Sequence, residues 1–303
     1  MRPNAAEYRW GSVEHASAIR AMVLLVWTVI VAGTPYQLYA LFPPDSLRSA
    51  SAFMQLLTAS LGATILLSPF FLFCVQTSTI VACVSWLMFP SVGRWLGGPA
   101  VLGVFVLDAL TKSIGGFANH AQTAALLLLA LFAIFSRREY LSPVALLTGV
   151  RSPGDGAPSP LRPYSCGALV WLCAFVLVIP YTYIGLNRIL IGGRELFSGD
   201  AIHDYLNTSA SIINQAGWVT QDPWRDLLRW GFLGITCLEV SSIGTLFFPR
   251  YATFWLACIV LFHVTTLFTM NILFWENAVL LAVTFWPGWK HASTPLLLHG
   301  NDP

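Results

Sequence analysis

Nine apolar runs follow one another along this chain, and most of them are close to twenty residues long. A helix needs about 20 predominantly apolar residues to cross the hydrocarbon core of a bilayer. These runs are continuous, whereas the strands of a membrane barrel alternate apolar and polar residues. The runs therefore predict an all-α protein, a polytopic bundle of about eight or nine transmembrane spans or re-entrant segments. They lie at about residues 20–42, 52–74, 76–91, 98–116, 119–136, 166–187, 228–247, 251–269 and 271–287.

The composition supports the same class of protein. Only 10% of the 303 residues are charged and 56% are hydrophobic, whereas soluble domains average roughly 25% charged residues. We find no nucleotide-binding glycine loop, and nothing in the sequence suggests a nucleic-acid partner. We therefore expect one membrane domain over residues 1–303, with no soluble domain attached. Its expected location is the cell membrane, as a multi-pass protein in contact with the lipid bilayer.

Two polar segments divide the apolar runs. Residues 137–165 are rich in Pro, Gly and Ser and carry four arginines, which by the positive-inside rule places them in the cytoplasm. The basic amino terminus favours the same side, so an even number of crossings should separate it from this linker. Five runs lie between them, and we expect the run at 98–116 to be re-entrant or merged with a neighbour. The acidic segment 191–227 is expected outside the cell, with a short surface helix at about 198–207 that begins at Asp200.

All six cysteines lie within apolar runs. They form neither a C-x-x-C pair nor a cysteine–histidine cluster with zinc spacing, so no metal site is predicted. We expect them to act as small buried hydrophobic residues, with a disulfide between two spans as the alternative. They are Cys74, Cys83, Cys166, Cys173, Cys237 and Cys258.

Ionisable residues inside the apolar runs need a specific reason, because each costs about 2.5–3.5 kcal/mol on insertion scales. Asp108 and Lys112 are four residues apart and should pair on one helix face, with a catalytic role as the alternative. Glu239 lies too deep in its run to reach water, so it should pair with an arginine, lysine or histidine of another span. Arg188 and Glu276 either serve a buried site or extend to the lipid head groups.

Two histidines also lie in apolar runs. A lone intramembrane histidine is more often a hydrogen-bonded link between helices than a catalyst, and both roles are open here. We take His120 and His263 as candidate catalytic residues. The candidate ligand-binding residues are Asn119, Asn187, Arg188 and Glu239. Because polar residues facing lipid are costly, we expect His120, Arg188, Glu239 and His263 to converge on one interior cavity.

Four segments, taken in order, resemble a known membrane family. They are ANHAQTAALLLLALFAIFS (118–136), YTYIGLNRIL (181–190), CLEVSSIGTLFFPR (237–250) and LFHVTTLFTMNILFW (261–275). Over about residues 15–287 the chain looks like the HTTM family, the membrane domain shared by vitamin K-dependent gamma-carboxylase and many bacterial proteins. The resemblance implies that His120, in its Asn-His context, matches a histidine thought to stabilise the carboxylation transition state. It also implies a quinone-type lipid, such as reduced vitamin K, as the cofactor.

The chain departs from this family pattern at Arg188. In the carboxylase the matching residue is a lysine, which acts as the base toward vitamin K hydroquinone. A guanidinium stays protonated in proteins, so Arg188 cannot abstract that proton. It can hold a carboxylate, a lipid phosphate or a quinone oxygen in a bidentate fork, with the Asn187 amide beside it. The carboxylase also has a large lumenal domain that no segment after Pro287 matches, so we expect no authentic carboxylation.

Two functions are open from the sequence. The first is a membrane enzyme of carboxylase-like ancestry, with a polar pocket between spans for a lipophilic or anionic ligand. The second is a non-catalytic membrane helper for the maturation or export of a small secreted peptide. A plain channel or transporter is less favoured, because the chain has no internal repeat with matched broken helices.

Overall fold

The regular structure of this chain is entirely helical in the residues that the structure describes. This structure is a computed structural model, and it describes residues 13–47, 52–115, 121–135, 140–149, 164–199, 224–270 and 274–286. The expected all-α architecture is confirmed within those ranges, which contain no strand.

Five helices are long and apolar enough to cross a membrane. They are α1 (Val13–Gly33), α4 (Pro69–Met88), α5 (Gly93–Gly115), α8 (Tyr164–Ser198) and α11 (Pro249–Met270). Several shorter elements connect or cover them: η1 (Tyr36–Leu41), η2 (Pro44–Leu47), α2 (Ala52–Leu61), α3 (Ala63–Leu66), η3 (Pro90–Val92), α6 (Ala121–Ile134), α7 (Pro143–Thr148), α10 (Trp224–Val240), η4 (Ser241–Leu246) and α12 (Trp275–Phe285). The class of a helical membrane protein is thereby supported.

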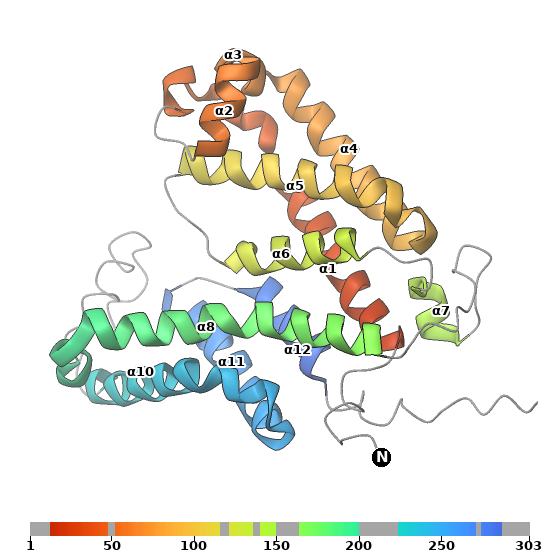
Figure 1. The fold of residues 1–303 in the computed structure, drawn as a ribbon. Helices are drawn as coiled ribbons and strands as arrows, with labels where there is room; N and C mark the ends of the chain where they lie inside the picture. Colours follow the sequence, from red (N-terminus) through yellow and green to blue (C-terminus); the bar gives the residue numbers. More distant parts are fainter. Residues whose placement is uncertain are drawn as a thin grey trace, which may run out of the picture.

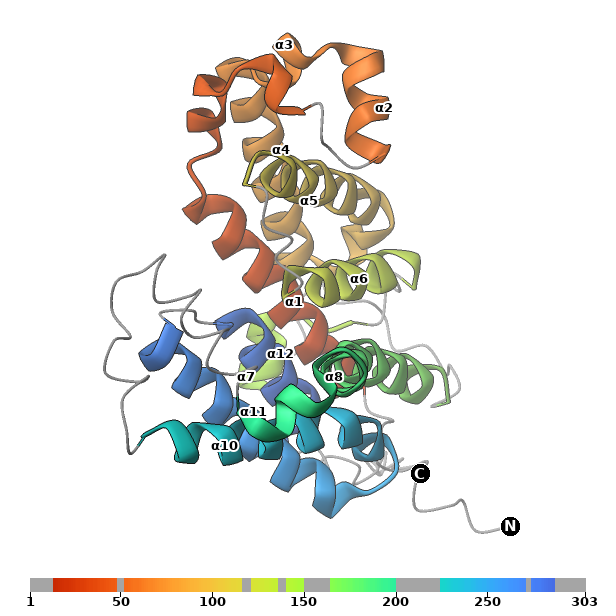
Figure 2. The same cartoon turned by 90° about the vertical axis from the view of Figure 1, so that its left-hand side faces the viewer.

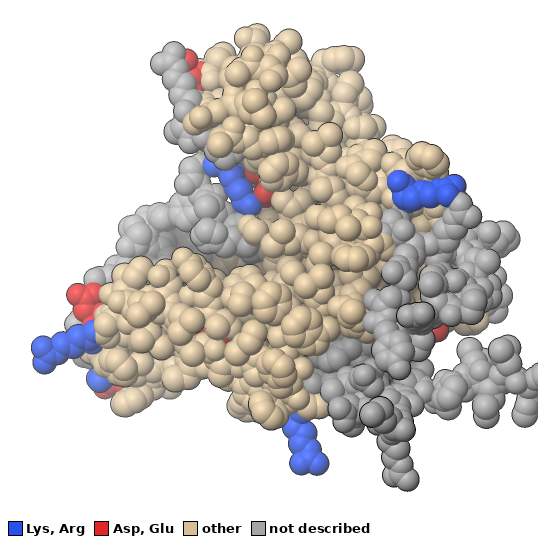
Figure 3. All heavy atoms as spheres, in the orientation of Figure 1, with Lys and Arg blue, Asp and Glu red and all other residues tan. Residues whose placement is uncertain are grey.

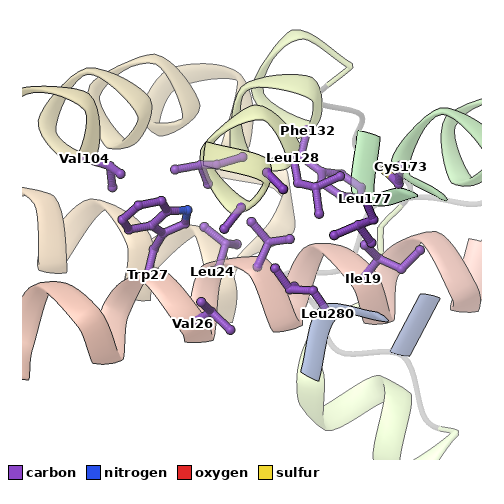
Figure 4. Close-up of a cluster of buried hydrophobic side chains, with 14 of the residues drawn as sticks. Ile19, Leu24, Val26, Trp27, Val104, Leu128, Phe132, Cys173, Leu177 and Leu280 are labelled. Atoms are coloured by element: carbon purple, nitrogen blue, oxygen red, sulfur yellow. The ribbon is translucent and has the colours of Figure 1, made fainter. Parts of the chain in front are cut away.

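Helix α1 joins two groups of helices. Figures 1 and 2 show α2–α5 on one side, α8 and α10–α12 on the other, and α1 passing between them beside α6. Buried side chains from α1, α5, α6, α8 and α12 meet along this crossing (Figure 4). They include Ile19, Leu24, Trp27, Val104, Leu128, Phe132, Leu177 and Leu280.

The outer surface of the bundle is apolar. On the face shown in Figure 3, Lys, Arg, Asp and Glu occupy only a few isolated places. Large hydrophobic side chains are exposed instead, including Phe70, Leu102, Leu190, Leu261 and Phe268. Exposing so many apolar side chains to water is unfavourable, whereas lipid tails solvate them well.

Helices α1 and α4 run antiparallel, and each satisfies the carboxyl end of the other. Arg20, fully buried near the start of α1, donates from Nη1 to the Trp86 carbonyl in the last turn of α4, at 2.7 Å. Gln76 of α4 donates from Nε2 to the carbonyls of Val31 at 2.7 Å and Thr34 at 3.0 Å, where α1 ends. The last carbonyls of a helix have no partner within it, and lipid supplies none. The two side chains therefore remove an unpaired end from each helix.

The amino end of α1 and the start of the basic linker lie at the same end of the bundle. Arg20 donates from Nη2 to the Leu141 carbonyl at 3.0 Å, and the Leu141 amide donates to Ser17 Oγ at 3.0 Å. This agrees with the even number of crossings expected between these two regions. The side of the membrane on which this end lies stays a prediction.

The apolar stretch 52–91 is divided differently from the prediction of two spans. Gly62, with φ of 84°, separates α2 from the single turn of α3, and the Ser68 hydroxyl then caps α4 by accepting from the Phe71 amide. The chain continues as one helix through residues 74–76, because no breaker lies there. The run at 98–116 was expected to be re-entrant or merged with a neighbour, but it lies in the continuous helix α5, which is long and apolar enough to cross a membrane by itself. Residues 52–91 supply one helix long enough to cross a membrane where two spans were expected, and the number of crossings before the linker stays a prediction.

We expect Arg20→Met to lower the free energy of unfolding by about 2–4 kcal/mol, because it leaves two buried carbonyls without their charged donor. The measurement is unfolding of the purified protein in detergent micelles. Arg94→Met is the matched control, since Arg94 is exposed at the start of α5, and its effect should be much smaller. Equal effects of the two substitutions would contradict the capping role of Arg20.

Candidate functional site

Helices α8 and α10 lie side by side (Figure 1) and approach each other closely at Gly185. A methyl group added there would lie 2.7 Å from the Val240 amide nitrogen and 2.8 Å from Glu239 Cβ. Only a residue without a side chain allows this approach, as is common between membrane helices. Gly185 therefore brings the backbone of α8 against the residue that carries the buried carboxylate.

An ion pair joins the two helices one turn beyond Gly185. Arg188 Nη1 lies 2.7 Å from Glu239 Oε2. The Glu239 side chain is 3% exposed and that of Arg188 is 25% exposed. This confirms that Glu239 pairs with a basic residue of another helix, and it shows Arg188 engaged inside the bundle rather than extended alone toward head groups.

Arg188 keeps donors for a further partner. Its Cζ lies 4.9 Å from the centroid of the Phe232 ring, so the guanidinium rests on an aromatic face as well as on Glu239. A guanidinium has five N–H donors, and only Nη1 is hydrogen-bonded to a residue that the structure describes. The fixed guanidinium can therefore donate to an acceptor oxygen while its pair with Glu239 stays intact.

A second buried contact lies on the same face of α8. Tyr181, two helical turns before Arg188, places its hydroxyl 2.7 Å from His263 Nε2 of α11. The tautomer of His263 decides which atom donates. The Trp255 ring meets Tyr181 edge-on at 5.5 Å, and the Phe274 ring lies 5.4 Å from the imidazole. His263 thus serves as a link between helices, and its Nδ1 atom is buried without a partner among the described residues.

The short helix η4 is fastened between these elements. Ser242 Oγ donates to the Val178 carbonyl at 3.0 Å and shares a 2.6 Å hydrogen bond with the Thr182 hydroxyl. Trp255 Nε1 donates to the Leu238 carbonyl at 2.9 Å. These bonds hold Glu239 and its ion pair in a fixed register relative to α8 and α11.

Sequence reasoning missed Tyr181. Its spacing from Gly185 and Arg188, four and seven residues, places all three on one helix face, and this pattern could have identified it.

Of the residues predicted for the site, Arg188 and Glu239 meet directly, and His263 lies against Tyr181 on that same face. Asn187 is exposed. His120 and Asn119 lie outside the described residues, so their convergence with the others stays a prediction, as does a cavity.

Two other polar expectations can be compared with the structure. Lys112 Nζ lies 2.7 Å from Asp108 Oδ2, which confirms their pairing along α5. Glu276, in the first turn of α12, is 4% exposed and so does not extend to head groups. A surface helix was expected at about 198–207, starting at Asp200; residues 200–207 lie outside the described part of the chain.

The described cysteines and potential metal ligands form no additional site. All six cysteines are free thiols, so the disulfide alternative is wrong. Cys83, Cys166 and Cys173 are buried as expected, whereas Cys74 and Cys237 are exposed. In the parts of the chain that the structure describes, no three His, Cys, Asp or Glu side chains are placed to hold a metal ion.

Comparison of the chain with models of known families, with curated proteins and with solved structures gives no match. The resemblance to the HTTM family therefore rests on the four sequence segments alone. The proposed function therefore rests on the geometry around Arg188.

We expect the ion pair to show strong coupling between its two residues. Arg188→Met should lower the free energy of unfolding in detergent micelles by about 3 kcal/mol, because it leaves a buried carboxylate unpaired. Glu239→Met should cost less, since the remaining Arg188 is partly exposed. The double variant Arg188→Met/Glu239→Met should recover most of the loss, because an apolar pair replaces the buried charges. Additive losses would contradict the coupling, and Arg194→Met at the exposed end of α8 is the control.

Proposed function

We propose that this chain is a multi-pass protein of the cell membrane that binds the polar head of a lipophilic or anionic ligand at Arg188. The observation that carries the proposal is the Arg188 guanidinium, held by Glu239 and Phe232, with its other N–H groups donating to none of the described residues. Such a preorganised fork suits a carboxylate, a phosphate or a quinone oxygen. Glu239 is then the residue that positions the fork.

The position of Arg188 along α8 supports a ligand that is lipophilic elsewhere. Arg188 lies 22 residues after Cys166, where the apolar part of α8 begins. At a rise of 1.5 Å per residue this is about 33 Å, close to the thickness of the hydrocarbon core. A head group bound at Arg188 would lie near one membrane surface, while its apolar tail lies along the exposed hydrophobic side chains of the helices.

Stability alone is a weak reason for such an ion pair. Apolar residues of similar volume often stabilise a buried site as well as two opposite charges do, because charges must first lose their hydration. A retained pair that also leaves donors of Arg188 without a partner among the described residues is therefore better explained by binding. In this proposal Arg188 anchors the ligand and does not act as a base, since a guanidinium stays protonated.

The finer topology belongs to the same proposal. The shorter apolar helices α2, α6 and α12 lie in the bilayer with the five long ones, and the less apolar helix α10 joins them, which gives eight or nine spans or re-entrant segments. Helix α8 begins after the arginine-rich linker, so Arg188 lies toward the outer surface if that linker is cytoplasmic. The resemblance to the HTTM family supports a quinone-type lipid, such as reduced vitamin K, as one candidate ligand.

Arg188→Lys is the test, because lysine keeps the charge and loses the fork. We expect binding of reduced vitamin K, or of decanoate as a simple anionic amphiphile, to weaken by about 5- to 150-fold, or about 1–3 kcal/mol. Binding is measured on purified protein in nanodiscs, with Arg194→Lys as the control. Unchanged binding in Arg188→Lys would exclude Arg188 as the anchor of the ligand.

Wild-type protein given reduced vitamin K, bicarbonate and a glutamate-containing peptide should form no carboxyglutamate, because the protonated Arg188 cannot act as the base. Carboxylation by the wild-type protein would contradict this.

A further inference from the structure

The ion pair at Arg188 carries no net charge. Arg188 Nη1 donates to Glu239 Oε2 at 2.7 Å, so one positive charge is balanced by one negative charge. No other described Lys, Arg, Asp or Glu forms an ion pair with either residue. A ligand that reaches Arg188 therefore meets a neutral pair rather than a free cation.

The charges nearest to this pair along the two helices do not alter the balance. Arg194 and Glu195 are adjacent, opposite in charge and exposed near the end of α8. Arg229 of α10 lies ten residues before Glu239, which is about 15 Å along the helix axis. Its side chain packs against Gly199, where α8 has ended. Among the described side chains, the charge at the site is set by Arg188 and Glu239 alone.

Burial keeps the Glu239 carboxylate beside whatever binds Arg188. Its side chain is 3% exposed, and the α8 backbone lies directly against it at Gly185. A carboxylate or phosphate bound at Arg188 would add a second negative charge, with one positive charge for the two. An uncompensated charge is costly in an apolar bundle, and repulsion between like charges is stronger where water is excluded. The site therefore disfavours an anion.

An uncharged acceptor uses the same donors without this cost. The N–H groups of Arg188 other than those of Nη1 donate to none of the described residues. A carbonyl oxygen has two lone pairs, so it can accept from one or two of these groups and adds no charge. The Phe232 ring, on which the guanidinium rests, is an apolar surface and offers no donor to replace the hydration of an anion.

We infer that the Arg188 site takes an uncharged carbonyl group in preference to a carboxylate or a phosphate. The inference rests on the proposed function, because it narrows the ligands that the guanidinium holds there. Glu239 is then the residue that sets specificity, since its charge cancels the attraction of Arg188 for anions. Two classes of membrane compound carry such a carbonyl group: acyl lipids, as esters, and quinones.

The test compares decanamide with decanoate, which have nearly the same shape and differ in charge. The full chain is placed in nanodiscs of ether-linked phosphatidylcholine, which has no carbonyl group of its own, at about pH 9, where decanoate is ionised. Affinities refer to the probe concentration in the bilayer, measured with empty nanodiscs. Wild-type protein should bind decanamide at least about tenfold more tightly. Equal binding, or tighter binding of decanoate, would overturn the inference.

Two variants locate the discrimination. Glu239→Gln keeps an acceptor for Arg188 but removes the balancing charge, so it should reverse the preference in favour of decanoate. Asp108→Asn is the matched control, because Asp108 is 4% exposed and pairs with Lys112 at 2.7 Å on another helix. This control should keep the wild-type preference. A preference for decanamide that survives in Glu239→Gln, or is lost in Asp108→Asn, would contradict the role of Glu239.

A measurement without ligand checks the charge on Glu239. Infrared difference spectra between the wild-type protein and Glu239→Gln report whether this carboxyl group is ionised or protonated. The bands of an ionised carboxylate are expected. A protonated carboxyl would remove the negative charge on which the preference depends and would overturn the inference.

Arg188→Lys separates this inference from the proposed function. If the variant binds both probes as the wild-type protein does, Arg188 is not the anchor and the proposed function fails. If the variant weakens both, and decanoate is the tighter ligand of the wild-type protein, the anchor stands and the preference for an uncharged carbonyl fails.

Competition against decanamide identifies the source of the carbonyl group. Displacement by a diacylglycerol identifies the ester of an acyl lipid, and displacement by an oxidised quinone with an isoprenoid tail identifies a quinone. Displacement by both supports a site that recognises the carbonyl group alone. Displacement by neither would contradict a membrane carbonyl compound as the natural ligand.

Discussion

Hydrocarbon offers no hydrogen bonds, and this constraint determines how the described helices are arranged. Every polar group inside the bundle must find its partner in the protein. Arg20 and Gln76 do so by reaching the carbonyl ends of neighbouring helices, and Glu239 does so through Arg188. Because these partners belong to different helices, each contact also fixes how far one helix is shifted along another.

The two ion pairs in the described residues differ in this respect. Asp108 and Lys112 both belong to α5, so their ion pair makes two charges tolerable in an apolar helix, and the link to a second helix is the 3.5 Å contact of Lys112 Nζ with Thr123 Oγ1 of α6. Arg188 and Glu239 connect α8 to α10 at the close approach made by Gly185. The first pair acts within one helix, whereas the second is a contact between two helices that sets the register of the site.

Local patterns in the sequence were sufficient for part of this structure. The apolar runs predicted the helices, the spacing of Asp108 and Lys112 predicted their pairing, and the depth of Glu239 in its run predicted a basic partner. The identity of that partner required Gly185, since only the close approach there selects Arg188. Partners that are backbone carbonyls, such as those of Arg20, leave no trace in residue type. Gly62 and Pro69 mark the division of 52–91, but the apolar residues continue across both of them, so hydrophobicity alone does not show where one helix ends and the next begins.

The mutual capping of α1 and α4 has a consequence for biosynthesis. The ribosome completes α1 well before the segment that carries Trp86 and Gln76, so for that interval the Arg20 guanidinium has no carbonyl to bind and the end of α1 lacks its amide donor. Until α4 is made, both the Arg20 guanidinium and the carboxyl end of α1 are costly to place in lipid. The first helix should therefore wait beside the translocation channel, in polar surroundings, and enter the bilayer together with α4 as a hairpin.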